Sequence, residues 1–366
     1  LSAPPPTAKD GPTRATNMDS TNAQPNIAPH FLPMLTGFFL LLLTWYIFTY
    51  GKKSKPVWHS MKHVKPFLAN RKTKYSVKLT HKTFVTHDTI RFRFSLGNDA
   101  LRLGLPVGKC LKVFGPNIAQ RQQAVEWNPK PANDRGPRDP RPHQNDDMTK
   151  DGDWKDVIER KYTPCTLDSE LGYFEFTIKV YKAGESNIFP DGGKMSQYME
   201  SLQLGDALTI QGPFGKMQYV GRGNWKGSGK KYGERNHLGL ICGGSGVTPM
   251  IQVIQAILSD PQDNTTISML YANKTLDDII IKAQLDEWSE QSQGQFTVHY
   301  TLDSPPEKDW SGYTGFVSDT MIQETLPPPS SDALILMCGP PPMITFACLP
   351  NLEKLKYDMK NGIGEF

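Results

Sequence analysis

The sequence predicts an antiparallel β-barrel domain followed by a parallel-sheet α/β domain, with a transmembrane helix ahead of both. Three patterns support this prediction. Apolar and polar residues alternate from Tyr173 to Val180, which is the period of a half-buried strand. After residue 237 strand-like and helix-like segments alternate, as they do in parallel sheets covered by helices. Residues 31–50 form an uncharged stretch long enough to cross a bilayer as a helix.

The first 50 residues predict a tail and an anchor. Residues 1–30 are rich in Pro, Thr, Ala and Asn and lack large apolar side chains, so we expect them to be disordered. Residues 31–50 would span about 30 Å as a helix, at about 1.5 Å per residue. A cleaved signal peptide is disfavoured because no small-residue cleavage site follows the stretch. A buried soluble helix is disfavoured because apolar residues occur on every face.

A basic segment follows the apolar stretch. Residues 51–74 are interpreted as a basic linker, and residues 51–87 hold ten Lys and Arg and no Asp or Glu. A membrane surface is the expected partner of such a segment, and the positive-inside rule places the following residues in the cytosol. From residue 88 onward, 29 Lys and Arg stand against 35 Asp and Glu, which argues against nucleic-acid binding.

The cysteines and histidines predict neither disulfides nor a metal site. The five cysteines are widely spaced and include no Cys-x-x-Cys pair. His59 and His63 could share a helix face, but no third ligand accompanies them in the zincin pattern. We therefore predict no metal centre.

Residues 75–222 form the predicted β domain. Phe92 and Phe94 alternate with arginines, and short runs are separated by turns at 105–108, 204–206 and 212–215. Within this domain, residues 118–158 carry five Pro, seven Lys and Arg, and eight Asp and Glu, with few apolar side chains. We expect this segment to be a solvated insertion.

Residues 237–366 form the predicted α/β domain. An apolar strand at 238–241 precedes a glycine-rich turn and a helical pattern over Met250–Leu258. Further strands are predicted at 267–272, 296–302 and 334–338, each followed by a helical stretch, with one helix around 277–288.

Two segments of the β domain have the composition of a phosphate site. Arg160–Thr166 combines a cation, an aromatic ring and hydroxyls that could bind a diphosphate and pack on a heterocycle, although ordinary edge strands have similar composition. Gly192–Gln197 is a glycine turn that opens a helix, where free N–H groups and Lys194 suit a phosphate. The alternative is ordinary helix capping by Ser196.

Two further segments follow strands of the α/β domain. Gly243–Met250 lies between a strand and a helix, where glycines let a ligand approach the backbone, but it lacks the Gly-x-Gly-x-x-Gly spacing. Cys338–Met343 also follows a strand and opens a helix. Taken alone, Cys338 is interpreted as a buried structural thiol.

The order of these four segments resembles that of the NADH-cytochrome b5 reductase family, within the ferredoxin-reductase-like flavoenzymes. The resemblance runs from about Tyr75 to Leu355 and is interrupted by the predicted insertion. The matching segments are Leu103–Gly108, Gly192–Gln197, Gly243–Met250, Leu336–Met343 and Ala347–Leu352.

The resemblance implies that the β domain is an FAD-binding barrel. Arg160, Tyr162 and Thr163 match the flavin motif of the family, with Lys161 between them. The other implied FAD positions are Thr177, Lys179 and Tyr181 on the flavin-facing strand and Gly193, Lys194, Met195 and Ser196 in the pyrophosphate turn.

The resemblance also implies that the second domain binds NADH. The positions matched around the nicotinamide nucleotide are Thr248, Pro249, Cys338, Gly339 and Met343. Thr248 matches a threonine that reaches the flavin, and the candidate catalytic residues are Thr163, Thr248 and Cys338. Asp278, with Asp277 beside it, matches an acidic position linked to NADH over NADPH, since a carboxylate near the 2′ position repels a phosphate.

Some positions depart from the family. Lys161 replaces the usual small residue or proline, Lys182 stands where an aromatic residue is common, and the insertion enters immediately before the flavin motif. Residues 360–366 do not reproduce the usual aromatic C-terminal end, so the sequence assigns no contacts to this tail.

The resemblance implies a membrane-anchored enzyme that transfers a hydride from NADH to FAD and then single electrons to cytochrome b5. The endoplasmic reticulum and the outer mitochondrial membrane both suit a cytosol-facing anchor. An acidic acceptor would be helped by a basic docking face. Candidate residues for that face are Lys194, Lys216, Lys226, Lys230 and Lys231.

Two alternatives remain open from the sequence. The first is a flavoreductase that serves another acceptor, as the flavin fragment of nitrate reductase does. The second is a membrane-tethered nucleotide-binding protein without catalysis.

Overall fold

The computed structural model describes residues 63–117, 155–185, 191–229 and 232–366. The predicted tail at 1–30, the predicted anchor at 31–50, residues 51–62 of the linker and residues 118–154 of the insertion lie outside these residues. Among the residues described, no helix has both the length and the apolar character needed to cross a membrane.

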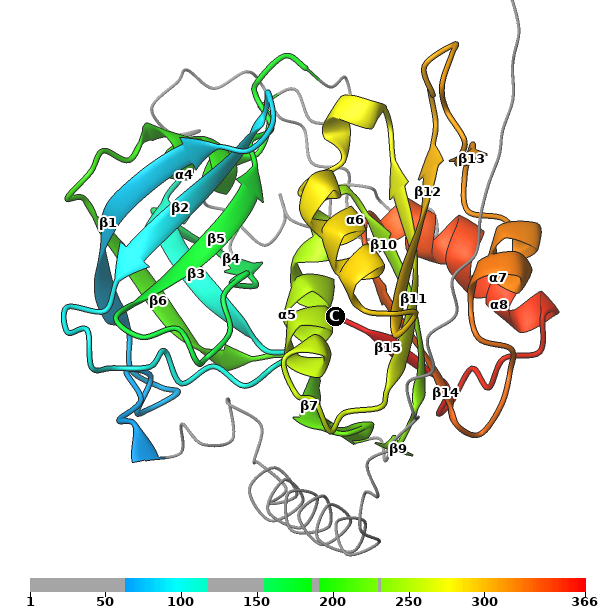
Figure 1. Ribbon diagram of the computed structural model, residues 1–366. Coiled ribbons are helices and arrows are strands. Elements are labelled where there is room, and N and C mark those ends of the chain that lie inside the picture. The colour runs from blue at the N-terminus through cyan, green and yellow to red at the C-terminus, as the bar shows by residue number, and fades with distance from the viewer. Residues whose placement is uncertain (1–62, 118–154, 186–190, 230–231) are drawn as a thin grey trace, which may run out of the picture. The chain divides into compact units, whose positions relative to one another are not determined.

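The first domain is a six-stranded antiparallel sheet with the order β4-β3-β6-β1-β2-β5 (Figure 1). Within the described ranges no ladder joins β4 to β5, so these two strands are the edges of the sheet. The last two residues of the predicted insertion, Val157 and Ile158, belong to β4. The strands are β1 (Tyr75–Phe84), β2 (Thr89–Ser95), β3 (Cys110–Pro116), β4 (Val157–Tyr162), β5 (Tyr173–Lys179) and β6 (Ala207–Phe214).

Aromatic side chains fill the core of this domain. Phe92 and Phe94 lie opposite Phe176 and Phe174 in the β2–β5 ladder, and all four side chains are fully buried. The predicted alternation therefore places one face of each strand inward. Helix α4 (Lys194–Ser201) packs beside β3 and β4. Gly115 of β3 permits this packing, because a Cβ there would lie 2.6 Å from the Tyr198 ring.

A small antiparallel sheet connects the two domains. It comprises β7 (Met217–Gly221), β8 (Asn224–Gly227) and β9 (Gly233–Glu234). The buried Tyr219 hydroxyl donates to the carboxylate of Asp263 in the second domain. This hydrogen bond fixes the connecting hairpin to the α/β domain.

The second domain is a parallel sheet with the order β13-β12-β11-β10-β14-β15. Its strands are β10 (His237–Gly243), β11 (Thr266–Asn273), β12 (Phe296–Leu302), β13 (Tyr313–Thr314), β14 (Ala333–Cys338) and β15 (Ile363–Glu365). The helical segments are η4 (Gly244–Gly246), α5 (Val247–Leu258), η5 (Leu276–Asp278), α6 (Lys282–Gln291), α7 (Asp319–Thr325), the π-helix η6 (Met343–Cys348) and α8 (Leu349–Lys354).

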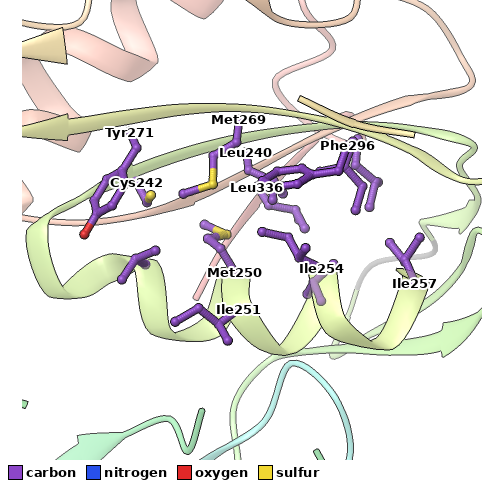
Figure 2. Packing of buried hydrophobic residues seen from close by; sticks show 14 of the residues in the cluster. Leu240, Cys242, Met250, Ile251, Ile254, Ile257, Met269, Tyr271, Phe296 and Leu336 are labelled. Carbon is purple, nitrogen blue, oxygen red and sulfur yellow. The ribbon is translucent and has the colours of Figure 1, made fainter. Parts of the chain in front are cut away.

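Helices cover both faces of this sheet, which explains its almost continuous apolar strands. Figure 2 shows α5 packed on one face, where Met250 and Ile254 approach Leu240 and Leu336 of the strands. The other face belongs to a separate apolar cluster with residues from α7, η6 and α8. The predicted antiparallel domain and parallel α/β domain are therefore both present.

Two predicted helices differ from those observed. The helix predicted around 277–288 is divided into η5 and α6, because Asp278 closes a capping box with Thr275 and Ile281 takes a left-handed backbone at φ 55°. The helix predicted from Met250 begins three residues earlier, at Val247. Pro249 is compatible with this start, since the first turn of a helix needs no N–H from it.

A partly buried ion pair fixes the segment that follows β4. Asp168 pairs with Arg102, and it accepts the backbone N–H groups of Gly104 and Leu105. Burial raises the pKa of the Asp168 carboxyl more than Arg102 and these N–H groups lower it. Burying the two charges therefore costs free energy of folding. Removing only one partner costs more, because it leaves the other charge buried and unpaired.

We expect Asp168→Ala to lower the free energy of unfolding by about 3 kcal/mol, because Arg102 and two N–H groups lose their acceptor. Urea unfolding of the FAD-loaded protein measures this change. The neighbouring exposed variant Glu170→Gln should change it by less than about 1 kcal/mol. Equal effects of the two variants on the free energy of unfolding would contradict this stabilising role of Asp168.

Candidate functional site

The first group of candidate residues gathers at the ends of β4 and β5. Arg160 and Tyr162 alternate with the exposed Lys161, so they share the other face of β4. The Tyr162 ring lies 5.8 Å from the Phe176 ring. Burial raises the pKa of the Tyr162 hydroxyl, and the Arg160 cation acts in the opposite direction.

Ser196 joins the glycine turn to the end of β5. Its hydroxyl donates to the carbonyl of Gly193 (2.9 Å) and accepts the N–H of Tyr181 (3.2 Å). The N–H of Gly193 donates in turn to the carbonyl of Tyr181 (2.8 Å). A Cβ on Gly193 would lie 2.5 Å from Ser196 Oγ, so the turn requires glycine at this position.

Other candidates of the first domain differ in exposure. Thr163 is half-buried directly after β4, and Thr177 and Met195 are buried. Lys194 is only 6% exposed, so it does not belong to a basic surface patch as predicted. Lys230 and Lys231 of that predicted patch lie outside the described residues.

The second group gathers where two turns of the α/β domain meet. A Cβ on Gly246 would lie 2.2 Å from the carbonyl oxygen of Cys338. A Cβ on Gly243 would lie 2.7 Å from Met343 Sδ, and one on Gly339 would lie 2.6 Å from Met343 Cε. The glycines therefore allow the turn after β10 to touch the turn after β14. Met343 opens a π-helix, a rare conformation that often marks functional sites.

The turn after β10 leaves backbone open to a ligand. Gly244 has a φ of 50°, and a Cβ there would meet nothing within 4 Å. Tyr271 supports the turn by donating its hydroxyl hydrogen to the Gly244 carbonyl (2.9 Å). Thr248 donates to the Ser245 carbonyl (3.2 Å), and Pro249 is buried beside it. A ligand could thus approach Gly244 without meeting a side chain on it.

The thiol of Cys338 is kept neutral. Burial raises the pKa of Cys338 to about 12, and the nearby Glu365 carboxylate adds to the effect. Protonated thiol is therefore the form present at neutral pH.

Lys179 links the two groups. It lies on β5, and its Nζ is 2.5 Å from Asp88 Oδ2 and 2.7 Å from Asp278 Oδ1. Asp278 also accepts from the N–H and the hydroxyl of Thr275 (3.1 and 2.7 Å). Asp278 is thus partly buried and held by its neighbours, whereas Asp277 is exposed.

A hydrogen bond and an aromatic contact join the domains at a second place. The N–H of Gly108, in the turn before β3, donates to Gln252 Oε1 of α5 (3.1 Å). The Phe366 ring would lie 3.3 Å from a Cβ on Gly108, and the Phe366 N–H donates to the Met337 carbonyl (3.1 Å). The tail left unassigned in the sequence thus ends in an aromatic residue at the domain junction, with 363–365 forming β15.

Three supporting residues were missed by the sequence analysis. Asp88 holds Lys179, Gln252 holds Gly108, and Tyr271 holds the turn at Gly244. Their partners are distant in the chain, since 144 positions separate Gly108 from Gln252. Only a turn signal at Asp88 is visible in the sequence, and it indicates no partner.

Two of the departures from the family, Lys161 and Lys182, lie at the surface. Both side chains are exposed, and Lys182 Nζ lies 3.3 Å from Glu200 Oε1.

Family models match both domains. Residues 76–135 and 149–219 match the oxidoreductase FAD-binding domain, and residues 240–349 match the oxidoreductase NAD-binding domain. NADH-cytochrome b5 reductase 1 of Bos taurus is 42% identical over 293 residues, which cover 78% of this chain and 84% of that protein.

Nitrate reductases are similar over the same part of the chain. Nitrate reductase [NADH] 1 of Zea mays is 38% identical over 304 residues, covering 82% of this chain and 43% of that protein. The solved structure of the cytochrome b5 reductase domain of Ulva prolifera nitrate reductase superposes with a TM-score of 0.69 at 34% identity, covering 82% of this chain and 99% of that one.

We expect Gly246→Ala to lower the rate of flavin reduction by NADH at least about tenfold, because the new Cβ must push the turn away from Cys338. Anaerobic stopped-flow absorbance of the FAD-loaded variant measures this rate. Glu290→Ala, at an exposed position of α6 in the same domain, is the control. Loss of bound FAD in Gly246→Ala would contradict a defect confined to the second domain.

The raised pKa of Cys338 predicts slow alkylation. Because the thiolate is the reactive form, labelling by iodoacetamide should become about tenfold faster for each pH unit between pH 7 and pH 10. Mass spectrometry of the Cys338 peptide measures the rate. A rate that levels off below pH 9 would show that the thiol ionises more readily than its burial indicates.

Proposed function

Because the chain belongs to the NADH-cytochrome b5 reductase family, we propose that it passes electrons from NADH through FAD to cytochrome b5. The chain is an NADH-dependent FAD oxidoreductase, and FAD and NADH are its cofactors. The observation that carries the proposal is the junction itself. Lys179 of the first domain contacts Asp278 of the second across 2.7 Å, so the two candidate groups border one site.

The residues of the first domain fit FAD. We propose that Arg160 and the turn at Gly193–Ser196 bind the diphosphate, and that Tyr162 and Tyr181 pack against the apolar parts of the cofactor. The place of this turn supports the assignment, because it opens helix α4, where backbone N–H groups and the helix dipole favour an anion. Thr163 and Thr177 are proposed to donate or accept hydrogen bonds at the ring.

The residues of the second domain fit NADH. We propose that the open backbone at Gly244, with Thr248, Pro249, Gly339 and Met343, receives the nicotinamide nucleotide. Cys338, protonated at neutral pH, offers a neutral and polarisable wall. Its thiol contributes no charge that would oppose transfer of a hydride.

When bound, the flavin would supply the chemistry, because it can accept the two electrons of one hydride and release them singly to a one-electron acceptor. The protein therefore needs no general acid or base. Its residues hold the two cofactors in register and limit the access of water, which is the geometric contribution expected for such an enzyme.

The acceptor separates two candidate functions. Cytochrome b5 is favoured because the reductase of Bos taurus is 42% identical over most of both chains. Electron transfer to another acceptor is the second candidate function, since nitrate reductases are 38–39% identical over a similar share of the chain. The relatives are catalytic in both cases, so a non-catalytic role has no support among them.

We expect the FAD-loaded full chain in detergent to lose its visible flavin absorbance when NADH is added without oxygen. Oxidised cytochrome b5 added next should then be reduced at a rate that exceeds its direct reduction by NADH by at least about a hundredfold. Bleaching without reduction of the haem would exclude cytochrome b5 as acceptor and favour the second candidate. Absence of bleaching would contradict the oxidoreductase itself.

We also propose that residues 31–50 anchor the protein with its catalytic part in the cytosol, at the endoplasmic reticulum or the outer mitochondrial membrane. The support is the uncharged 20-residue stretch followed by Lys52, Lys53 and Lys55. The limits of the other parts are proposed with it, namely a tail at 1–30, a linker at 51–74, the FAD-binding domain at 75–222 and the NADH-binding domain at 237–366.

We expect Leu41→Arg with Leu42→Arg to abolish flotation of the chain with liposomes. Each arginine at the centre of a spanning helix costs about 2.5–3.5 kcal/mol. Two arginines in the tail, Thr13→Arg and Thr16→Arg, are the control and should leave flotation intact. Flotation of both variants would show that another segment binds the membrane.

A further inference from the structure

Three charged side chains meet where the two domains touch. Lys179 bridges Asp88, from the turn between β1 and β2, and Asp278, from η5 of the second domain. Their side chains are 19%, 16% and 13% exposed, in the order Lys179, Asp88, Asp278. Little water therefore screens them from one another, and the attraction is stronger than between surface charges.

Hydrogen bonds from two threonines hold the Asp88 side chain in place. Its Oδ1 accepts the hydroxyls of Thr86 and Thr89 (both 3.0 Å), which leaves Oδ2 for Lys179. The contact with Lys179 lowers the pKa of Asp88, although burial opposes it, and the same lysine lowers the pKa of Asp278. Both carboxylates are therefore ionised at neutral pH.

The cluster of Asp88, Lys179 and Asp278 carries one net negative charge. Two carboxylates share a single ammonium, so Lys179 cannot neutralise Asp278 fully while Asp88 also holds it. Without the Asp88 charge, Lys179 and Asp278 would form a neutral pair. The residual charge on the second domain thus depends on a residue of the first.

We propose that Asp88 is a positioning residue that sets the preference for NADH over NADPH by drawing the Lys179 ammonium partly away from Asp278. This inference rests on the proposed function and on the family resemblance, which matches Asp278 to an acidic position near the 2′ position of the coenzyme. The 2′-phosphate of NADPH adds about two negative charges there and meets the residual charge of the cluster. NADH lacks that phosphate and is little affected.

The test measures binding rather than turnover. Dissociation constants of ADP-ribose and of 2′-phospho-ADP-ribose are determined by calorimetry on the FAD-loaded full chain at pH 8. Asp88→Asn keeps a side-chain oxygen for the two threonines and removes only the charge. The ratio of the phosphorylated to the unphosphorylated constant should fall about tenfold.

A second variant changes the charge in the opposite direction. Lys179→Met leaves both carboxylates unneutralised, so the same ratio should rise. This sign test decides the proposal even where Asp88→Asn does not fold. Glu175→Gln is the matched control, because it removes a carboxylate of the same strand, β5, that pairs with Arg93 of β2 instead of Lys179, and it should leave the ratio within about twofold.

Several outcomes would overturn the proposal. One is an unchanged ratio in Asp88→Asn, and another is an equal loss of both ligands, which would make Asp88 a structural tie only. A fall of the ratio in both Asp88→Asn and Lys179→Met would also overturn the proposal. Failure of NADH to bleach the flavin of the unmodified chain would count against the proposed function and leaves these binding ratios interpretable on their own.

Discussion

The structure depends on how its two domains are held against each other. Each cofactor is assigned mainly to one domain, while hydride transfer needs the reacting atoms within about 3–3.5 Å. The fixed geometry comes from contacts of different kinds, namely the ion pair between Lys179 and Asp278, the hydrogen bond from Gly108 to Gln252, and the Phe366 ring beside Gly108. The ion pair is only one of these, so loss of its charge need not separate the domains.

Glycines determine the geometry inside each half of the site. In the first domain Gly193 lets Ser196 reach back to the end of β5, and in the second Gly246 lets the turn after β10 touch Cys338. A Cβ on Gly193 would collide with Ser196 of the same turn, and one on Gly246 would collide with the Cys338 carbonyl at the end of β14. Glycine therefore permits close packing at these two positions, whereas Gly244 leaves backbone open to a ligand.

Much of the fold could be predicted from the sequence, because period-two alternation in the first domain and the strand–helix alternation in the second are local patterns. The single helix predicted around 277–288 was wrong because the capping box at Thr275 and Asp278 is a side-chain geometry, invisible to periodicity. In the site, the candidate turns carried composition signals. Asp88 and Gln252 did not, since each acts on a partner that only the tertiary structure brings near.

The charges of the site are arranged around an uncharged centre. Burial raises the pKa values of Tyr162 and Cys338, so neither side chain ionises near neutral pH. Fixed charges occur instead on Arg160 and on the cluster of Lys179 with its two carboxylates. This division suits the proposed chemistry, because phosphates need charge and hydrogen bonds whereas a hydride moves best between neutral rings in a site that excludes water. A charged group placed at the centre would favour one redox state of the flavin over the other, and the burial of Tyr162 and Cys338 prevents this.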